Sequence, residues 1–257
     1  MVRFFVSPHH ISGDDIKLGE QDTAHLRSLR LRPGELFVVC DENGTDYICE
    51  LAETADERQV AGERVRVGKG GESFAVIVEK RPSSGEANVR CCVFIAFSKG
   101  GRLDYAVQKS VELGAYEIVL FPSQRSISVP SDAGKKATRL QKIAYETAKQ
   151  CGRGRVPEVS TCDSMQAAVA MAAQADLPLF LYECEEKFSL KQALENAGKS
   201  DVISVVIGPE GGFEPHEAEL AVAKGLLAVT LGSRILRCET APAAALAAIM
   251  FHTGNLG

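Results

Sequence analysis

The sequence predicts an α/β protein with a mostly parallel sheet, preceded by a smaller β-rich domain. From residue 73 onward, apolar strand-like runs alternate with helical patterns, which is typical of a parallel sheet with helices on both faces. Before residue 70, short apolar runs separated by turns predict a small β-barrel. The glycine-rich residues 68–72 between them are the expected linker. The expected domains are therefore residues 1–70 and 73–257.

The first domain is expected to combine short strands with one helix. The dipeptide Asn43-Gly44 lies between two apolar runs and predicts a hairpin, because both residues tolerate positive φ. The segment from Asp22 to Arg32 has a helical pattern that Pro33-Gly34 stops. The expected strands are residues 3–6, 35–40, 47–51 and, with an interruption at Gly62, 59–67.

The second domain is expected to alternate strands and helices to its end. Gly114 is a plausible left-handed helix end, and Ser131 or Asp132 is a plausible start for the next helix. Pro215 suits the first position of a later helix, and Thr240 is the expected N-cap of the last one. The expected strands are residues 89–97, 116–121, 179–182, 202–207 and 227–230. The expected helices are residues 103–113, 137–151, 164–175, one from about 214, and 243–250.

Composition limits the possible roles of the chain. Its 257 residues are 45% apolar and 25% charged, and the net charge is −5. Binding to nucleic acid would therefore need a local basic patch rather than an overall positive field. We find no signal peptide and no run near the roughly 20 apolar residues that span a membrane. The eight cysteines are scattered, which favours reduced core residues in a cytoplasmic protein without a metal site.

Two loops carry the strongest functional signal. Gly208 to Gly212 follows the buried strand at 202–207, and Leu231 to Ala241 follows the strand at 227–230. Ligands of open α/β sheets bind at the carboxyl ends of strands, where both loops are expected. A tight strand-to-helix connection explains the first loop about equally well. A Rossmann site and a P-loop are disfavoured, because the chain lacks GxGxxG in that context and lacks GxxxxGK[ST].

The second loop contains several charges between a buried strand and an apolar helix. Such charges are costly to bury unless they are paired. A structural salt bridge from Arg237 to Glu239, or one across a dimer interface, is the plain alternative to a role in binding.

These residues resemble a known family. Gly-Pro-Glu-Gly-Gly at 208–212 and Leu-Gly-x-x-Ile-Leu-Arg-x-Glu-Thr-Ala at 231–241 are similar to motifs of the ribosomal RNA small subunit methyltransferase E family, a branch of the SPOUT methyltransferases. The similarity continues upstream in the right order. It includes residues 25–35, 99–102, 108–114, 150–153 and 156–157. The family usually has Thr where Cys238 stands, lacks Pro242, and has paired arginines where this chain has only Arg3.

The resemblance implies a specific fold and activity. The C-terminal domain would be a SPOUT-type α/β trefoil knot that binds S-adenosylmethionine, and the N-terminal barrel would be PUA-like and bind RNA. The family methylates N3 of a uridine in 16S ribosomal RNA of the small ribosomal subunit, uridine 1498 in the family's target. Its members are homodimers. The alternatives are another SPOUT enzyme, acting on a ribose 2′-hydroxyl or on transfer RNA, and a non-catalytic RNA-binding protein of ribosome assembly.

The implied chemistry suggests roles for side chains. Uridine N3 must lose its proton, and the negative charge that develops on the base must be stabilised, which suits arginine. Arg153 and Arg237 are the expected stabilising groups, and Glu210 or Glu112 is a conceivable proton acceptor unless solvent serves. The expected cofactor-binding residues are Tyr182, Gly208, Pro209, Glu210, Gly211, Gly212, Leu231, Gly232, Ile235, Leu236 and Arg237.

Basic residues gather in two parts of the sequence. One cluster runs from Arg125 to Arg155, where Gly152 and Gly154 alternate with arginines in a pattern suited to a loop near phosphates. A solvated helix face is the more common meaning of such a run. The expected RNA-binding residues are Arg3, Arg27, Arg30, Arg32, Lys99, Arg102, Arg125, Lys135, Lys136, Arg139 and Arg155.

Overall fold

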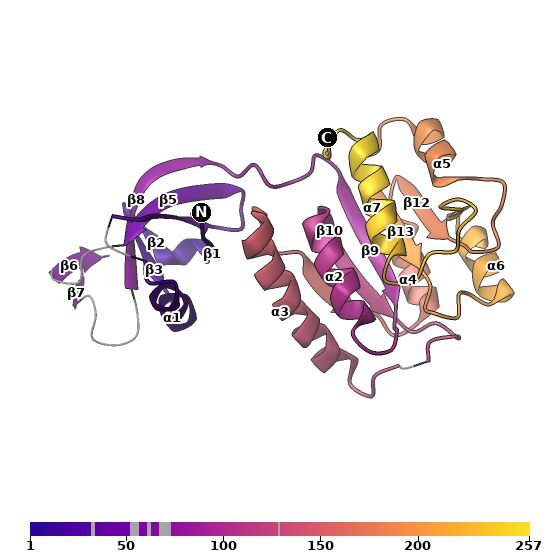
Figure 1. Ribbon diagram of the computed structural model, residues 1–257, viewed down its shortest axis with the longest axis horizontal. Coiled ribbons are helices and arrows are strands. Elements are labelled where there is room, and N and C mark those ends of the chain that lie inside the picture. The colour runs from indigo at the N-terminus through magenta and orange to yellow at the C-terminus, as the bar shows by residue number, and fades with distance from the viewer. Residues whose placement is uncertain (32–33, 52–56, 61–62, 67–72, 128) are drawn as a thin grey trace. The chain divides into compact units, whose positions relative to one another are not determined.

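The computed structural model describes residues 1–31, 34–51, 57–60, 63–66, 73–127 and 129–257. Arg32, Pro33 and the expected linker at 68–72 lie outside the described residues. The chain divides into two units. Unit 1 comprises residues 1–86 and 149–156, and unit 2 comprises residues 87–148 and 157–257 (Figure 1).

Unit 1 is built on a curled sheet with the strand order β1-β4-β5-β8-β3-β2. Strands β1 and β4 are parallel, and the other described pairs are antiparallel. The expected hairpin is present as β4 and β5, and Gly44 has φ +93° in its turn. The elements are β1 Arg3–Phe5, a 3-10 turn Pro8–His10, β2 Ile11–Ser12, β3 Asp15–Leu18, α1 Glu20–Ser28, β4 Leu36–Cys40, β5 Thr45–Leu51 and β8 Ser73–Pro82.

Two segments of unit 1 differ from the sequence-based expectation. The single strand expected at 59–67 is instead a pair of antiparallel strands, β6 Glu57–Val60 and β7 Glu63–Arg66. Residues 73–82, expected to begin the second domain, pair as β8 with both β5 and β3. This pairing places β8 inside the sheet of unit 1, which continues to Glu86.

Unit 2 contains a parallel sheet with the strand order β11-β10-β9-β13-β12-β14. In the sheet, strands β10 and β11 lie on one side of β9, and strands β13, β12 and β14 lie on the other side. Strand order therefore reverses at the β9–β13 pair, the kind of point at which open sheets bind ligands. The strands are β9 Arg90–Ala96, β10 Ala115–Phe121, β11 Glu158–Thr161, β12 Leu177–Leu181, β13 Val202–Ile207 and β14 Leu227–Val229.

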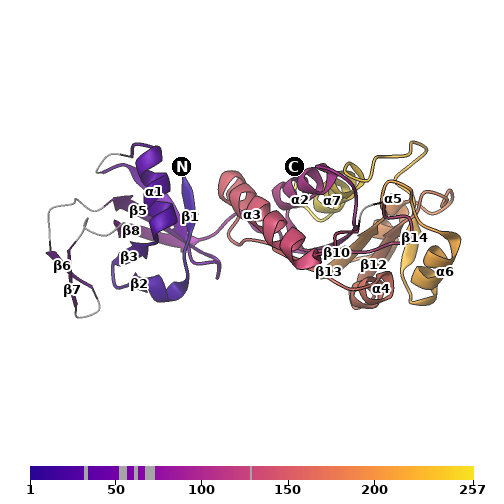
Figure 2. The ribbon, with the colours of Figure 1, turned by 90° about the horizontal axis from the view of Figure 1, so that it is seen from below.

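Helices cover both faces of this sheet, as the sequence predicts (Figure 2). Helices α2 and α7 contact each other on one face, and α4 and α6 contact each other on the other. Apolar side chains such as Phe94, Phe121, Phe180 and Phe213 fill the core beneath α4 and α6. The helices are α2 Arg102–Glu112, α3 Ala133–Cys151, α4 Met165–Ala172, α5 Leu190–Ala197, α6 Pro215–Ala223 and α7 Ala241–His252.

Several expected helix ends are confirmed. Gly114 follows α2 with φ +88°, and the Asp132 carboxylate accepts a hydrogen bond from the Lys135 N–H at 2.9 Å at the start of α3. Pro215 is the first residue of α6. Thr240 precedes α7, but its side chain makes no capping hydrogen bond. The trefoil threading of the chain end remains a prediction.

Candidate functional site

Unit 2 contains a cavity of about 670 Å³ at the carboxyl ends of its central strands. Residues directly after β12, β13 and β14 form its walls, and Arg102 at the start of α2 and Ala241 at the start of α7 also line it. The two glycine-bearing loops singled out in the sequence therefore meet in one hollow. Its size is within the range of about 300–1,000 Å³ that is usual for small-molecule sites.

The turn at Gly208–Gly212 forms a tightly packed floor for this cavity. A Cβ atom on Gly208 would lie 3.0 Å from the Phe213 ring, and one on Gly212 would collide with the Glu183 carboxylate. Gly212 also has φ +68°, which side chains with a Cβ rarely adopt. The Glu183 carboxylate fixes the turn by accepting the Phe213 N–H at 3.0 Å. Glycine is needed here because a neighbouring side chain occupies the space beside the main chain.

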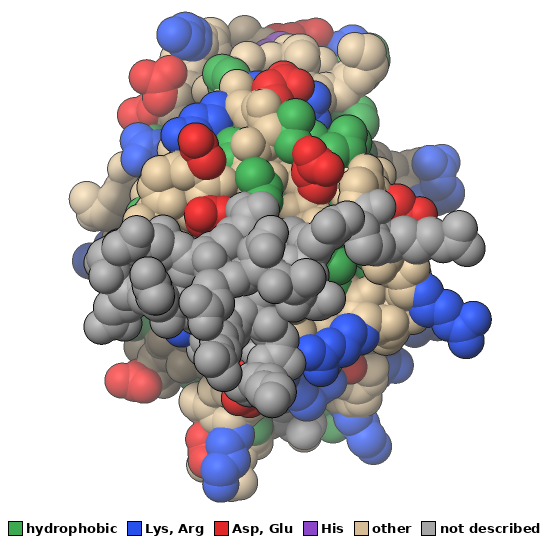
Figure 3. All heavy atoms as spheres, turned by 90° about the vertical axis from the view of Figure 1, so that its left-hand side faces the viewer, with side chains coloured by type: hydrophobic (Ala, Val, Ile, Leu, Met, Phe, Trp, Pro, Cys, Tyr) green, Lys and Arg blue, Asp and Glu red, His purple; other side chains and the backbone are tan. Residues whose placement is uncertain are grey.

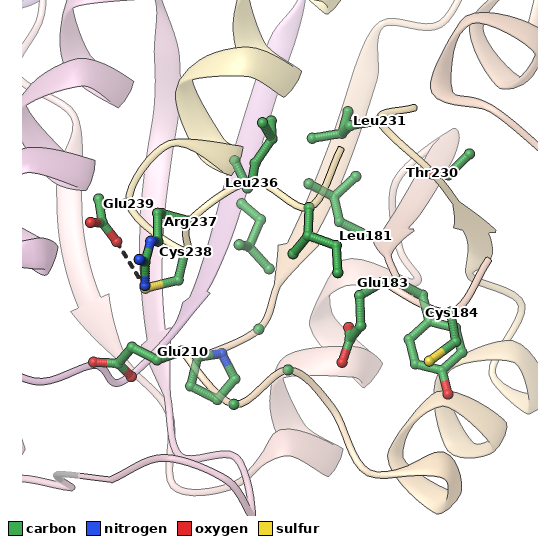
Figure 4. Close-up of a pocket in the computed structure, with 18 of the residues that line it drawn as sticks. Leu181, Glu183, Cys184, Glu210, Thr230, Leu231, Leu236, Arg237, Cys238 and Glu239 are labelled. Atoms are coloured by element: carbon green, nitrogen blue, oxygen red, sulfur yellow. Dashed lines mark hydrogen bonds between the residues drawn. The ribbon is translucent and has the colours of Figure 1, made fainter. Parts of the chain in front are cut away.

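The middle of the cavity is apolar and its ends are polar. Leu181, Leu231 and Leu236 surround the middle, Glu210, Arg237 and Glu239 lie at one end, and Glu183 and Cys184 lie at the other (Figure 4). An apolar middle suits a flat ring system, and the charged ends suit polar or charged groups.

Arg102 and Glu210 organise the charged end. One Glu210 oxygen, Oε1, accepts the Lys99 N–H at 2.7 Å and an Arg102 guanidinium N–H at 2.9 Å. The other oxygen, Oε2, is buried and has no hydrogen-bond donor among the described residues. A buried carboxylate oxygen without a donor is costly.

Glu239 lies within 3.6 Å of the Arg102 guanidinium. Among the described residues, Glu239 forms its ion pair with Arg102, and not with Arg237 as in the structural alternative considered from the sequence. Burial alone would raise the pKa of Glu239, but a backbone N–H, the Cys238 thiol, Arg102 and Arg237 outweigh it and hold this pKa below its usual range. Glu239 is therefore ionised at neutral pH.

Cys238 lies beside these carboxylates, and its thiol donates to Glu239 Oε2 at 3.2 Å. Burial and this hydrogen bond raise the pKa of Cys238 to about 12. Because the thiolate is the reactive form, Cys238 stays protonated and unreactive at neutral pH.

We expect an alkylating reagent to distinguish the cysteines of the cavity. At pH 8, iodoacetamide should modify the exposed Cys184 well before Cys238, because Cys238 remains a thiol. A ligand that fills the cavity should slow the reaction at Cys184 but not at the exposed Cys151, which does not line it. Peptide mass spectrometry over a time course measures both rates, and equal protection of Cys151 would contradict the prediction.

The structure brings all the expected cofactor-binding residues to this cavity. Tyr182, residues 208–212, Leu231, Gly232 and residues 235–237 line it. Ile235 is 85% exposed, so it lies at the rim rather than packing in the core. Their part in binding remains a proposal that this geometry supports.

Arg153 does not line the cavity. It belongs to unit 1 and is 3% exposed, and its guanidinium donates to both oxygens of the Glu86 carboxylate at 2.8 Å. The Gly154 N–H donates to the same carboxylate at 2.8 Å. The expectation that Arg153 is catalytic finds no support here, because Arg153 does not line the cavity and its guanidinium is bound by the Glu86 carboxylate.

The glycines beside Arg153 also have a structural explanation. A Cβ on Gly85 would collide with the Gly152 carbonyl oxygen, and a Cβ on Gly154 would collide with the Ser83 side chain. The alternation of glycine and arginine therefore lets two segments of unit 1 approach closely. This packing explains the glycines, and the interpretation of the segment as a phosphate-binding loop stays a prediction.

The expected RNA-binding residues fall into three groups. Arg3 is 8% exposed and bound to both Asp46 oxygens at 2.6 Å, so it is not available to phosphates. Arg102 and Arg125 line the cavity, and Arg139 is paired with Asp104. The rest of the described set lies on exposed or half-buried positions: Arg27, Arg30, Lys99, Lys135, Lys136 and Arg155. The view in Figure 3 shows basic side chains interspersed with acidic ones.

Several residues of the site were not predicted from the sequence. Glu183, Cys184, Arg234 and Glu239 line the cavity, and Arg102 was expected only to bind RNA. Glu183 and Cys184 directly follow the expected strand that ends at Tyr182. The rule that ligands bind at the carboxyl ends of strands could have found both.

Comparison with known proteins defines the class. The RNA methyltransferase domain model matches residues 85–250, and the RNA methyltransferase PUA domain model matches residues 18–63. The fold and the cavity are thus those of an RNA methyltransferase with an N-terminal PUA domain.

Individual relatives indicate which family of RNA methyltransferases the chain is similar to. A Bacillus subtilis protein named ribosomal RNA small subunit methyltransferase E is 29% identical over 91% of this chain and 89% of its own length. The Mesomycoplasma hyopneumoniae protein of that name is 30% identical over 65% of this chain and 72% of its own length. The Neisseria gonorrhoeae structure of that name, bound to S-adenosyl methionine, has a TM-score of 0.80 and 29% identity and covers 98% of this chain and 97% of its own. The chain belongs to the ribosomal RNA small subunit methyltransferase E family.

Proposed function

We propose that this protein transfers a methyl group from S-adenosylmethionine to N3 of a uridine in 16S ribosomal RNA. The observation that carries the proposal is the cavity that the two motif loops form together, with an apolar middle and charged ends. The family assignment and the cofactor-bound relative support the same reaction.

The residues present fit this cofactor. Leu181, Leu231 and Leu236 provide apolar surfaces for an adenine ring, and the glycines of the turn at 208–212 can offer a ligand only main-chain groups. When bound, S-adenosylmethionine supplies a methyl group that is already activated by its sulfonium. No cluster of His, Cys, Asp or Glu suited to a metal ion is found in the described parts of the chain.

The protein's own task is to prepare the acceptor. We assign Glu210 Oε2 the role of accepting the N3 proton, because it is a carboxylate oxygen with no donor of its own among the described residues. Arg237 and Arg102, which both line the cavity, are assigned to stabilise the negative charge that develops on the uracil oxygens. Arginine suits this role because it stays charged and presents several donors in one plane.

The proposal includes a homodimer that works in the cytoplasm on the small ribosomal subunit. Phe251 on α7 is 72% exposed, and Ile235 in the preceding loop is 85% exposed. A dimer contact would cover these two side chains. Among the described residues, no helix combines the length and the apolar character needed to cross a bilayer.

The direct test uses small ribosomal subunits from a strain that lacks the gene. Incubation with the purified protein and S-adenosylmethionine should produce one 3-methyluridine in 16S ribosomal RNA, located by nuclease digestion and mass spectrometry. A methyl group on a ribose or on transfer RNA would instead support a different SPOUT activity. Absence of any transfer and of any cofactor binding would support the non-catalytic alternative.

We expect the start of α3 to contact RNA phosphates. Lys135 is highly exposed and Lys136 is half-buried, whereas Arg139 is held by Asp104. The double variant Lys135→Glu/Lys136→Glu should weaken binding to small subunits and reduce the slope of log K against log salt by about 2. Filter binding at several salt concentrations measures the slope, and an unchanged slope would remove this patch from the interface.

A further inference from the structure

Glu217 on α6 is a buried carboxylate outside the cavity, and it is 5% exposed. Its Oε1 accepts the Gln124 N–H at 2.9 Å, and its Oε2 accepts the Glu214 N–H at 2.9 Å. The Ser123 hydroxyl also donates to this carboxylate, at 3.1 Å. Glu217 therefore joins two segments about ninety residues apart in sequence: the loop after β10 and the first turn of α6.

The loop after β10, which Glu217 holds, packs against the turn at Gly208–Gly212. Arg125 follows Gln124, and its guanidinium donates to the Gly211 carbonyl at 2.9 Å and to the Glu214 carboxylate at 2.7 Å. A Cβ on Gly211 would lie 3.1 Å from the Arg125 Cβ. The position of the turn thus depends on the loop after β10, and that loop is fixed by Glu217.

We propose that Glu217 is a positioning residue for cofactor binding, acting through the loop after β10 on the main-chain groups of Gly211 and Gly212. This inference rests on the proposed function, because it takes S-adenosylmethionine as the ligand of the cavity. The carboxylate satisfies one backbone donor with each oxygen, which fixes both segments with one rigid group. Glu183 holds the other side of the same turn through the Phe213 N–H.

The variant Glu217→Gln tests this role with almost no change in shape. Whichever way the amide is oriented, its NH2 group must face a backbone N–H, that of Gln124 or that of Glu214. We expect the Kd and KM for S-adenosylmethionine to rise by about tenfold, and kcat at saturating cofactor to change by less than about threefold. Isothermal titration and initial rates measure these values.

Matched variants make the result decisive. Glu219→Gln removes the same charge from an exposed position on the same helix, and it should leave Kd, KM and kcat unchanged.

Ser123→Ala removes one donor and keeps both backbone donors, so it should raise Kd by about threefold. It also serves as the test if the Glu217→Gln protein does not fold. The double variant Glu217→Gln/Ser123→Ala should raise Kd by less than the product of the two single-variant increases. Both substitutions act on the same junction between the loop after β10 and α6.

The outcomes separate this inference from the function on which it rests. A wild-type protein that binds no S-adenosylmethionine would overturn the cofactor assignment itself. A wild type that binds, together with a Glu217→Gln variant that melts at a lower temperature but keeps its Kd and KM, would show that Glu217 is structural only. A raised Kd and KM with retained kcat supports positioning.

Discussion

Replacing Glu210 with glutamine is expected to lower kcat for uridine methylation by about 100-fold or more. Glutamine keeps an oxygen that can accept from Lys99 and Arg102, as Glu210 Oε1 does. It replaces the donor-free Oε2 with an NH2 group, which cannot accept the N3 proton. Cofactor affinity should stay within about threefold, since the loss concerns the acceptor.

The pH dependence gives this prediction its sharpest form. With a carboxylate of the enzyme accepting the N3 proton, kcat of the wild type should be nearly flat from about pH 6 to 9. Without that base, the reaction depends on the small fraction of uridine already deprotonated, so kcat of the variant should rise by up to about tenfold per pH unit. Single-turnover rates across this range, with the cofactor saturating, measure the difference.

Two other carboxylates serve as controls. Glu112→Gln changes an acid that pairs with Lys109 outside the cavity, so its profile should match the wild type. Glu239→Gln weakens the other partner of Arg102 and should slow the reaction without a new pH dependence. A flat profile for Glu210→Gln, or a steep one for Glu112→Gln, would contradict the assignment of the base.

Replacing Gly85 with alanine is expected to lower the free energy of unfolding by about 3 kcal/mol. The added Cβ would collide with the Gly152 carbonyl oxygen and lie 3.1 Å from the Arg153 Cα. Both contacts are backbone, so no side chain can turn away to relieve them. The neighbouring Glu86 holds Arg153 and Gly154, and any displacement would strain that ion pair. Urea titration followed by circular dichroism measures the loss.

Gly19→Ala is the matched control in the same unit. Gly19 has φ −68°, and a Cβ there would meet no atom within 4 Å. We expect it to cost less than about 1 kcal/mol, as a change at a helix N-cap. Equal urea midpoints for Gly85→Ala and Gly19→Ala would contradict the prediction. They would show that the segments containing Gly85 and Gly152 can move apart with little loss of stability.

The fold followed well from the sequence where local patterns decide it. The unbroken apolar run at 202–207, Gly114 and Pro215 each predict their element, because strand burial, left-handed φ and a proline at the first helical turn are local properties. That β8 belongs to the sheet of unit 1 could not be predicted from the sequence. Its pairing with β5 and β3 is non-local, and a glycine-rich stretch before it indicated a boundary.

The main-chain part of the site could be predicted from the sequence, whereas the ion pairs of its charged side chains could not. The glycine turn at 208–212 is visible as a motif, and it does line the cavity. The partner of a charge is not visible in a linear pattern: Arg102 pairs with Glu210 and Arg153 with Glu86. In sequence, Arg102 and Arg153 are both basic residues near glycines, and only the fold shows which one reaches the cavity.

Strand β13 lies between β9 and β12 in the sheet, and the cavity takes its last wall from residues 229–241. During translation, a nascent chain that has released everything before these residues still lacks one side of the hollow. The ability to hold a cofactor therefore arises only after residues 229–241 have left the ribosome's exit tunnel.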